Sequence, residues 1–242
     1  MLSKVKSYHV KLNFKVMNAK TTTTFLEQFP LFDVLNEEEK RRLESMVEYK
    51  IKPKYNFIYL PDEASETTYF LAKGVVKIGT HSDDGKEVIK SLIHPKAMFG
   101  ELSLIGEKKR QDFAQALKEE VHVYALRVDD FKKLMRYNFN LCDRVMSLFG
   151  SRLLKAENKL ESLIFKDART RIIDFIKDSV NKRGMRIGFE MLLKHSLTHQ
   201  DIANITNTSR QTVTLVLNEL RKSDLIYFNR GKILIRDMAK LA

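Results

Sequence analysis

The sequence predicts an α+β protein with an N-terminal antiparallel β-roll of jelly-roll type, a long dimerisation helix and a C-terminal winged helix-turn-helix. Three observations predict this fold class. Between residues 50 and 128, short apolar runs alternate with turn residues, as in small antiparallel barrels. An apolar seven-residue repeat then runs from residue 142 to residue 163. Finally, residues 198–220 carry the cap and turn signals of two helices joined by a short turn.

We divide the chain into four parts. Residues 1–22 form a basic tail, residues 23–135 the β-roll, residues 136–165 the long helix and residues 166–242 the winged helix-turn-helix domain. The strands predicted in the β-roll are the apolar runs at residues 57–60, 69–72, 75–78, 88–93 and 121–126, with Gly85 in a hairpin turn. Residues 25–46 are predicted to be helical, because Asn36 is a good N-cap ahead of three glutamates.

The charge of the chain is concentrated at its two ends. The net charge is +12; residues 1–20 contain five lysines and no acidic residue, and residues 166–242 contain 15 basic and 8 acidic residues. Such blocks are typical of proteins that bind a polyanion, although a purely solubilising role also explains them.

Composition excludes several classes of protein. The single cysteine excludes an intramolecular disulfide, a four-cysteine zinc site and a cysteine-ligated iron–sulfur cluster, and we predict no metal site. No apolar run is long enough to span a bilayer and no secretory signal is evident, so we expect a cytoplasmic protein without a membrane partner. The sequence contains no P-loop, nucleophile elbow or HExxH motif, and we therefore predict that the protein is not an enzyme.

The long helix is predicted over residues 129–164, and its apolar residues follow alternating gaps of four and three. A strict repeat of this kind favours a partner helix and hence a homodimer, whereas packing of the helix on its own barrel is the alternative. The predicted dimer interface consists of Cys142, Met146, Phe149, Leu153, Ala156, Leu160 and Leu163.

The helix-turn-helix begins at Thr198, with Asp201 in the capping-box position. The turn between the two helices is predicted at Asn207, since asparagine tolerates a left-handed backbone, and Ser209 is the predicted cap of the second helix. Arg210 and Gln211 occupy the first turn of that helix, where arginine suits guanine and glutamine suits adenine. The alternative is an ordinary helical hairpin with solvated polar faces. The predicted DNA-binding residues are Thr198, His199, Gln200, Ser209, Arg210, Gln211, Thr212, Thr214, Asn218, Arg230 and Lys232.

A β-hairpin wing is predicted after the second helix, because apolar runs at residues 225–228 and 233–235 flank a polar turn. Arg230 and Lys232 at the tip of this wing would contact backbone phosphates, or would serve solubility alone.

From about residue 25 to residue 237, the chain resembles the Crp/Fnr superfamily of bacterial transcription regulators. The matching stretches are YFLAKGVVKIGTHSDDGKEVI at residues 69–89, FGELSLIGE at residues 99–107, FKDARTRIIDFI at residues 165–176 and the helix-turn-helix. The resemblance implies a cyclic-nucleotide-binding β-roll, a dimerisation helix and a reader of double-stranded DNA, with RNA polymerase as a further partner. The alternative function is a cyclic-nucleotide-binding module that acts through a protein partner.

The resemblance also implies an effector site in the β-roll, formed by Gly100, Glu101, Leu102, Arg110 and Gln111. In members that bind cyclic AMP, the glutamate accepts from a ribose hydroxyl and the arginine neutralises the phosphate. Here Gln111 replaces a serine and Ala156 replaces a hydroxyl-bearing residue, so we expect an effector other than cyclic AMP, or none. Arg110 could instead pair with Glu101. Neither an iron–sulfur cluster nor a haem is expected, because the family's cysteines and histidine for these groups have no counterparts here.

The predicted recognition helix departs from the family pattern as well. Members that read the half-site TGTGA carry arginine, glutamate and a second arginine on this helix. Arg210 matches the first, whereas Gln211 and Leu215 replace the other two. We therefore expect a palindromic site with a different half-site and with half-site centres about 34 Å apart.

Overall fold

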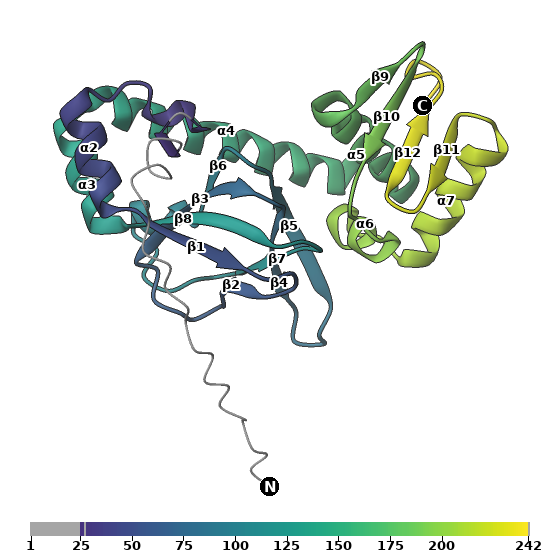
Figure 1. Cartoon of the computed structure of the whole chain (residues 1–242). Coiled ribbons are helices and arrows are strands. Elements are labelled where there is room, and N and C mark those ends of the chain that lie inside the picture. The colour runs from purple at the N-terminus through teal and green to yellow at the C-terminus, as the bar shows by residue number, and fades with distance from the viewer. Residues whose placement is uncertain (1–24, 27, 242) are drawn as a thin grey trace, which may run out of the picture.

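Two antiparallel four-stranded sheets form the N-terminal domain of the computed structural model, which describes residues 25–26 and 28–241 (Figure 1). The predicted basic tail, residues 1–22, lies outside the described residues. The sheet orders are β1-β8-β3-β6 and β2-β7-β4-β5. The strands are β1 Glu48–Lys52, β2 Phe57–Tyr59, β3 Thr67–Lys73, β4 Val76–His81, β5 Glu87–Ile93, β6 Ala97–Phe99, β7 Phe113–Ala116 and β8 Val121–Arg127. The sequence patterns missed β1, β6 and β7, because these strands are short or mostly polar.

A cluster of aromatic rings closes one end of this β-roll. Phe25, Phe32 and Phe131 are fully or almost fully buried around Phe70 of β3, with ring centroids 5.1 to 6.0 Å from that of Phe70. The covering segments are the 3-10 helix η1 Pro30–Phe32, helix α2 Glu37–Met46 and helix α3 Val128–Tyr137. The predicted helix over residues 25–46 is therefore interrupted, because Pro30 starts a separate 3-10 turn. Asn36 caps α2 in a capping box, as its sequence suggests.

The long helix α4, Phe139–Phe165, begins after a break at Asn138. Asn138 has extended backbone angles (φ −126°, ψ 98°), and its side chain accepts a hydrogen bond from the Leu141 amide at 2.9 Å. The prediction of one continuous helix over residues 129–164 is therefore wrong at Asn138, because an asparagine that caps one helix ends the helix before it.

The C-terminal domain surrounds its own core with three helices and a small sheet. The elements are α5 Ala168–Arg183, β9 Met185–Ile187, β10 Glu190–Lys194, α6 His199–Thr206, α7 Arg210–Lys222, β11 Ile226–Asn229 and β12 Lys232–Ile235, with sheet order β11-β12-β10-β9. The local signals of the helix-turn-helix are confirmed. Thr198 and Asp201 form a capping box, Asn207 is left-handed with φ 52°, and Ser209 caps α7.

The C-terminal domain packs against the β-roll through α6 and β5. Leu117 of the β-roll is buried together with residues of the C-terminal core. Asn204 Nδ2 on α6 donates to Glu87 Oε1 on β5 at 3.0 Å, and Arg183 NH1 lies 3.5 Å from His94 Nδ1. The two domains therefore share a real interface as well as the connecting helix.

Neither a metal site nor a membrane span is found in the part of the chain that the structure describes. No three His, Cys, Asp or Glu side chains in residues 25–26 and 28–241 come together as metal ligands. No helix within the same residues is long and apolar enough to cross a membrane.

Candidate nucleic-acid interface and effector site

Helix α7 divides its residues between a buried stripe and a polar face. The buried stripe consists of Val213, Val216, Leu217 and Leu220. Arg210 and Gln211 begin the helix outside this stripe, and both are exposed. Ser209 fixes the start of the helix, because its hydroxyl oxygen accepts from the Thr212 amide at 3.0 Å. The first turn of α7 therefore presents an arginine and a glutamine to solvent, as recognition helices do.

The N-terminus of α6 adds polar side chains to the same surface. Thr198 and Asp201 exchange hydrogen bonds in the capping box, so that the helix begins at a fixed point. His199 Nδ1 and Thr214 Oγ1 share a hydrogen bond of 2.9 Å, which joins α6 to α7. Burial, and then the charge of Arg210, lower the pKa of His199, so its ring is neutral at neutral pH.

The wing β11–β12 lies beside α7 and turns at Gly231. This glycine has φ 76°, the left-handed backbone that a tight hairpin turn needs. Arg230 and Lys232 flank it and are exposed. The guanidinium of Arg221 on α7 lies over the ring of Phe228, 5.2 Å from its centroid, and holds the wing against the helix.

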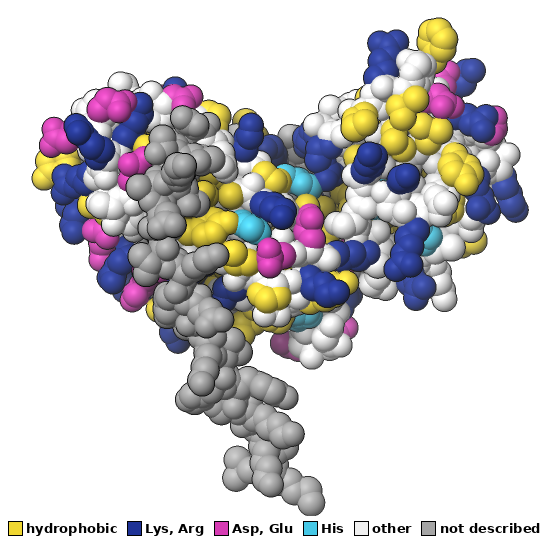
Figure 2. Space-filling model, viewed as in Figure 1, with side chains coloured by type: hydrophobic (Ala, Val, Ile, Leu, Met, Phe, Trp, Pro, Cys, Tyr) yellow, Lys and Arg dark blue, Asp and Glu magenta, His cyan; other side chains and the backbone are white. Residues whose placement is uncertain are grey.

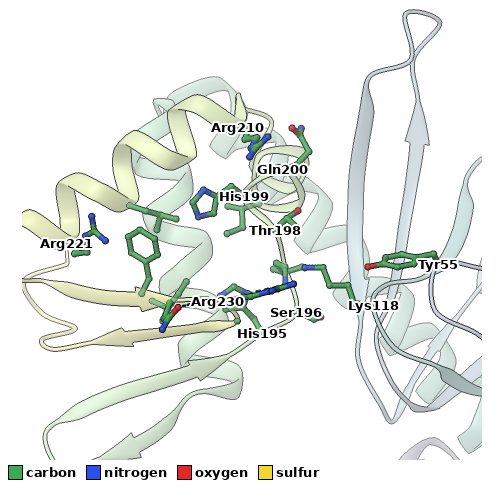
Figure 3. A pocket seen from close by; sticks show the side chains of 17 residues that line it. Tyr55, Lys118, His195, Ser196, Thr198, His199, Gln200, Arg210, Arg221 and Arg230 are labelled. Atoms are coloured by element: carbon green, nitrogen blue, oxygen red, sulfur yellow. Dashed lines mark hydrogen bonds between the residues drawn. The ribbon is translucent and has the colours of Figure 1, made fainter.

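These elements enclose a concavity of about 900 Å³, which we call the basic concavity (Figure 3). The C-terminal domain contributes Arg210, Arg221 and Arg230 to it. Lys118 and Tyr55 extend toward it from the β-roll, and sequence reasoning missed both because they lie far away along the chain. No acidic side chain within the described residues lines this concavity. Its charge therefore suits a phosphate backbone.

All but one of the predicted DNA-binding residues fall on two neighbouring surfaces. Those that line the basic concavity are Thr198, His199, Gln200, Arg210 and Arg230. Those on α7 and its cap, away from the concavity, are Ser209, Gln211, Thr212 and Asn218. Thr214 lies between the two surfaces, and Lys232 lines a second cavity of about 420 Å³ at the junction with the β-roll. Figure 2 shows lysine and arginine side chains spread over the visible face of the C-terminal lobe, and residues 166–242 contain 15 basic and 8 acidic residues, so this domain carries a net positive charge.

The predicted effector site is built around Arg110, which is buried with 2% of its surface exposed. Its NH1 donates to the Gly100 carbonyl at 3.0 Å and lies 3.4 Å from Glu107 Oε2, while NH2 donates to the Thr67 carbonyl. The ring of Tyr59 lies 4.4 Å from the guanidinium. The Nε atom is buried and has no acceptor among the described residues. An incoming anion would therefore have to displace the protein's own acceptors at NH1 and NH2, whereas Nε has none to displace in the described part of the chain.

Glu101 forms an ion pair with Arg152 of α4, whereas Arg110 lies beside Glu107, so the alternative in which Arg110 pairs with Glu101 is not what the structure shows. Burial lowers the pKa of Arg152 to about 10, which still leaves it charged at neutral pH. Glu101 is 5% exposed, and the ion pair joins the long helix directly to residues 100–102, which we call the effector loop after the site predicted there. Leu102 and Gln111 remain exposed at the rim of this site.

Two family models match the chain in the order of these domains. The model of the cyclic nucleotide-binding domain matches residues 52–138, and that of the Crp-like helix-turn-helix domain matches residues 170–242. The chain is a member of the Crp/Fnr family of transcription regulators. The helix-turn-helix of this Crp/Fnr regulator is accordingly a DNA-binding domain, and the family is one of regulators rather than of enzymes.

Relatives with known names are similar over most of their length. The global nitrogen regulator of Nostoc sp. is 27% identical over 186 residues, which cover 76% of this chain and 83% of the relative. The CRP-like cAMP-activated global transcriptional regulator of Mycobacterium tuberculosis is 26% identical over 190 residues, which cover 78% and 84%. The solved structure of the c-di-GMP responsive global regulator CLP of Xanthomonas campestris has the same fold, with a TM-score of 0.71, 18% identity, and coverage of 84% of this chain and 100% of that one. The names of the last two specify different signals, and likeness alone therefore does not identify the effector of this Crp/Fnr regulator.

Two adjacent stripes of α4 in the Crp/Fnr regulator have different surroundings. The stripe that contacts its own β-roll consists of Val145, Arg152 and Lys159, spaced by seven residues. The next stripe, one residue later in each case, consists of Met146, Leu153 and Leu160, which are 51%, 62% and 59% exposed. Phe149 packs partly on its own domain. The β-roll therefore leaves most of the apolar seven-residue repeat of α4 uncovered, which argues against the alternative that this helix packs on its own barrel.

Proposed function

We propose that this Crp/Fnr regulator acts as a homodimer whose two α7 helices read the two halves of a palindromic site. The observation that carries this proposal is the exposed pair Arg210 and Gln211 in the first turn of α7, a helix whose opposite stripe is buried; of the two, Arg210 lines the basic concavity. Glutamine accepts from and donates to adenine, whereas the family's glutamate accepts from cytosine. The half-site should therefore differ from TGTGA, and its two copies should be centred about 34 Å apart.

The dimer is supported by the open stripe of α4. Large apolar side chains that are more than half exposed on one helix rarely face water in a stable monomer, and a seven-residue repeat matches the period of a paired coil. Met146, Leu153 and Leu160 supply that repeat. A parallel pair of α4 helices would bury them and would place the two C-terminal domains side by side.

The effector proposed here is not cyclic AMP. Arg110 already donates to the carbonyls of Gly100 and Thr67 through NH1 and NH2, with Nε alone left without an acceptor among the described residues, and Glu101 is paired with Arg152. A cyclic nucleotide would have to break these bonds, and it would not gain the hydrogen bond of the family's serine, because Gln111 stands at that position. If the β-roll responds to a ligand, a different anion is the better candidate.

RNA polymerase is the proposed protein partner, and the cytoplasm is the proposed location.

Selection of binding sites from random duplexes tests the DNA-reading proposal. We expect a palindrome with adenine at the base pair that Gln211 contacts, and affinity that falls steeply with added salt. Recovery of TGTGA half-sites would contradict the half-site proposal. Absence of any preference among duplexes would favour the alternative function through a protein partner.

The oligomeric state tests the dimer proposal. The double variant Leu153→Lys, Leu160→Lys should sediment as a monomer, because it places two charges in the paired seam. Asn158→Lys changes an exposed residue of the same helix outside the seam, and this control should remain a dimer. A wild-type protein that sediments as a monomer at micromolar concentration would exclude the proposal.

A thermal-shift screen with cyclic nucleotides tests the effector proposal. Cyclic AMP should leave the Tm of the wild-type protein unchanged at millimolar concentration. A rise in Tm that disappears in Arg110→Ala would show that the arginine does exchange its internal acceptors for a phosphate.

A further inference from the structure

Leu215 occupies an unusual position on α7. Its side chain is 70% exposed, although the other aliphatic residues of the helix at positions 213, 216, 217 and 220 are at most 5% exposed. It lies four residues after Gln211 and three residues before Asn218, so that these three side chains share one face of the helix. A leucine therefore stands in the middle of a surface that is otherwise polar.

Packing within the chain does not account for this leucine. The buried stripe of α7 is complete without it, and Glu219, farther along the helix, pairs with Arg169 at 3.3 Å and marks the border with α5. Single exposed apolar side chains are common on protein surfaces. This one differs because it lies on the face that carries Gln211, one turn further along α7.

The major groove offers one apolar group to such a side chain. Among the four base-pair orientations, the C5 methyl of thymine is the apolar feature, whereas guanine and cytosine present only acceptors and a donor. Leucine cannot pair with those polar atoms, so its approach to a G·C pair would remove their water without replacement. Contact with a thymine methyl buries apolar surface on both sides.

We infer that Leu215 is a specificity-determining residue that selects a thymine by its methyl group. This inference rests on the proposed function, because it needs α7 to lie in the major groove. Four residues of helix advance by about 6 Å, roughly two base-pair steps. The thymine therefore lies one or two base pairs from the adenine that Gln211 contacts, and the half-site contains an A·T-rich core.

Site selection with two variants tests the assignment. Leu215→Ala should lose the preference for thymine at one position of each half-site and retain the preferences set by Arg210 and Gln211. Leu215→Arg should replace thymine by guanine at the same position, because arginine pairs with guanine O6 and N7. Ile187→Ala removes a similarly sized side chain that is 48% exposed on β9, and as the control it should select the wild-type site.

A second measurement removes the methyl group from the DNA. Uracil in place of that thymine should weaken binding of the wild-type protein about fourfold per half-site, the value for one buried methyl group. The same change should leave binding of Leu215→Ala unaltered. If the wild type selects a palindrome but uracil at every thymine position leaves its affinity unchanged, the inference about Leu215 fails while the proposed function stands. If the wild type selects no sequence, both fail.

Discussion

Asn204 on α6 donates a hydrogen bond to Glu87 on β5, with 3.0 Å between Nδ2 and Oε1. The second oxygen of this carboxylate accepts from Lys77 Nζ at 2.6 Å, which fixes it on its own sheet. Asn204 in turn accepts from Gln200 Nε2 at 2.8 Å. One line of hydrogen bonds therefore connects β5 of the β-roll to Gln200, which lines the basic concavity.

Replacing Asn204 by alanine should loosen this junction. A hydrogen bond to a partly exposed carboxylate contributes about 1 kcal/mol, so the amides of α6 and β5 should exchange about five times faster with deuterium. Glu120→Gln serves as the control, because this carboxylate contacts His122 within the β-roll. Unchanged exchange in Asn204→Ala would show that the bond contributes nothing to docking.

The junction should also weaken in acid, through His94. Burial, and then the neighbouring charge of Arg183, lower the pKa of His94 to about 4 from its ordinary value of 6.5. The unfolded chain therefore binds the proton more tightly than the folded chain, so the stabilisation is complete above pH 6.5 and is lost as the pH falls toward 4. With solvent screening taken into account, the loss at pH 5 should be about 1 kcal/mol.

Thermal denaturation between pH 5 and pH 7.5 measures this loss. His94→Gln should show a shallower fall of Tm below pH 6.5 than the wild type, since the side chain no longer takes up a proton. Part of the slope should remain, because burial also lowers the pKa of His195 at the same junction. Identical slopes for the variant and the wild type would contradict the assignment to His94.

The helix-turn-helix was predictable because its signals are local. Thr198, Asn207 and Ser209 each act on backbone groups within four residues, so their identity indicates where α6 begins and ends and where α7 begins. The break at Asn138 was missed for the opposite reason. Its amide also donates to the Val34 carbonyl and to Glu39, more than 95 residues earlier, and no local pattern reveals those partners.

The same distinction applies to the two sites. The proposed DNA-binding residues on α6 and α7 follow from helical spacing, whereas the contribution of Lys118 to the basic concavity depends on how two domains dock. In the β-roll, the residues of the effector loop were identified by resemblance. Their partners were not, because Arg152 reaches Glu101 from 51 residues away on a different element.

Arg210 and Lys232 should contribute to DNA binding in different ways. Arg210→Ala should weaken binding to the selected site by roughly 1–3 kcal/mol and relax the preference at one base pair, because a base contact is lost. Lys232→Ala should weaken binding to all sequences alike and reduce the slope of log affinity against log salt by about 1. Titrations of specific and random duplexes at several salt concentrations separate the two effects. Equal losses on both duplexes in Arg210→Ala would exclude a base contact.

Gly100 should tolerate no side chain, because it combines a left-handed backbone with a close neighbour. Its φ is 68°, and a Cβ atom there would lie 3.1 Å from Arg110 NH1. Gly100→Ala should lower the free energy of unfolding by about 1–2 kcal/mol, since the strained backbone costs about 1 kcal/mol and the buried guanidinium must also move. Gly150→Ala is the matched control, because this glycine lies inside α4 and the added Cβ would meet no described atom within 4 Å apart from its chain neighbours and the adjacent helix backbone, and alanine should stabilise the helix by up to about 1 kcal/mol. The Tm should therefore fall in Gly100→Ala and rise in Gly150→Ala. A fall of equal size in both variants would contradict the prediction that the backbone and the Arg110 contact at position 100 require glycine.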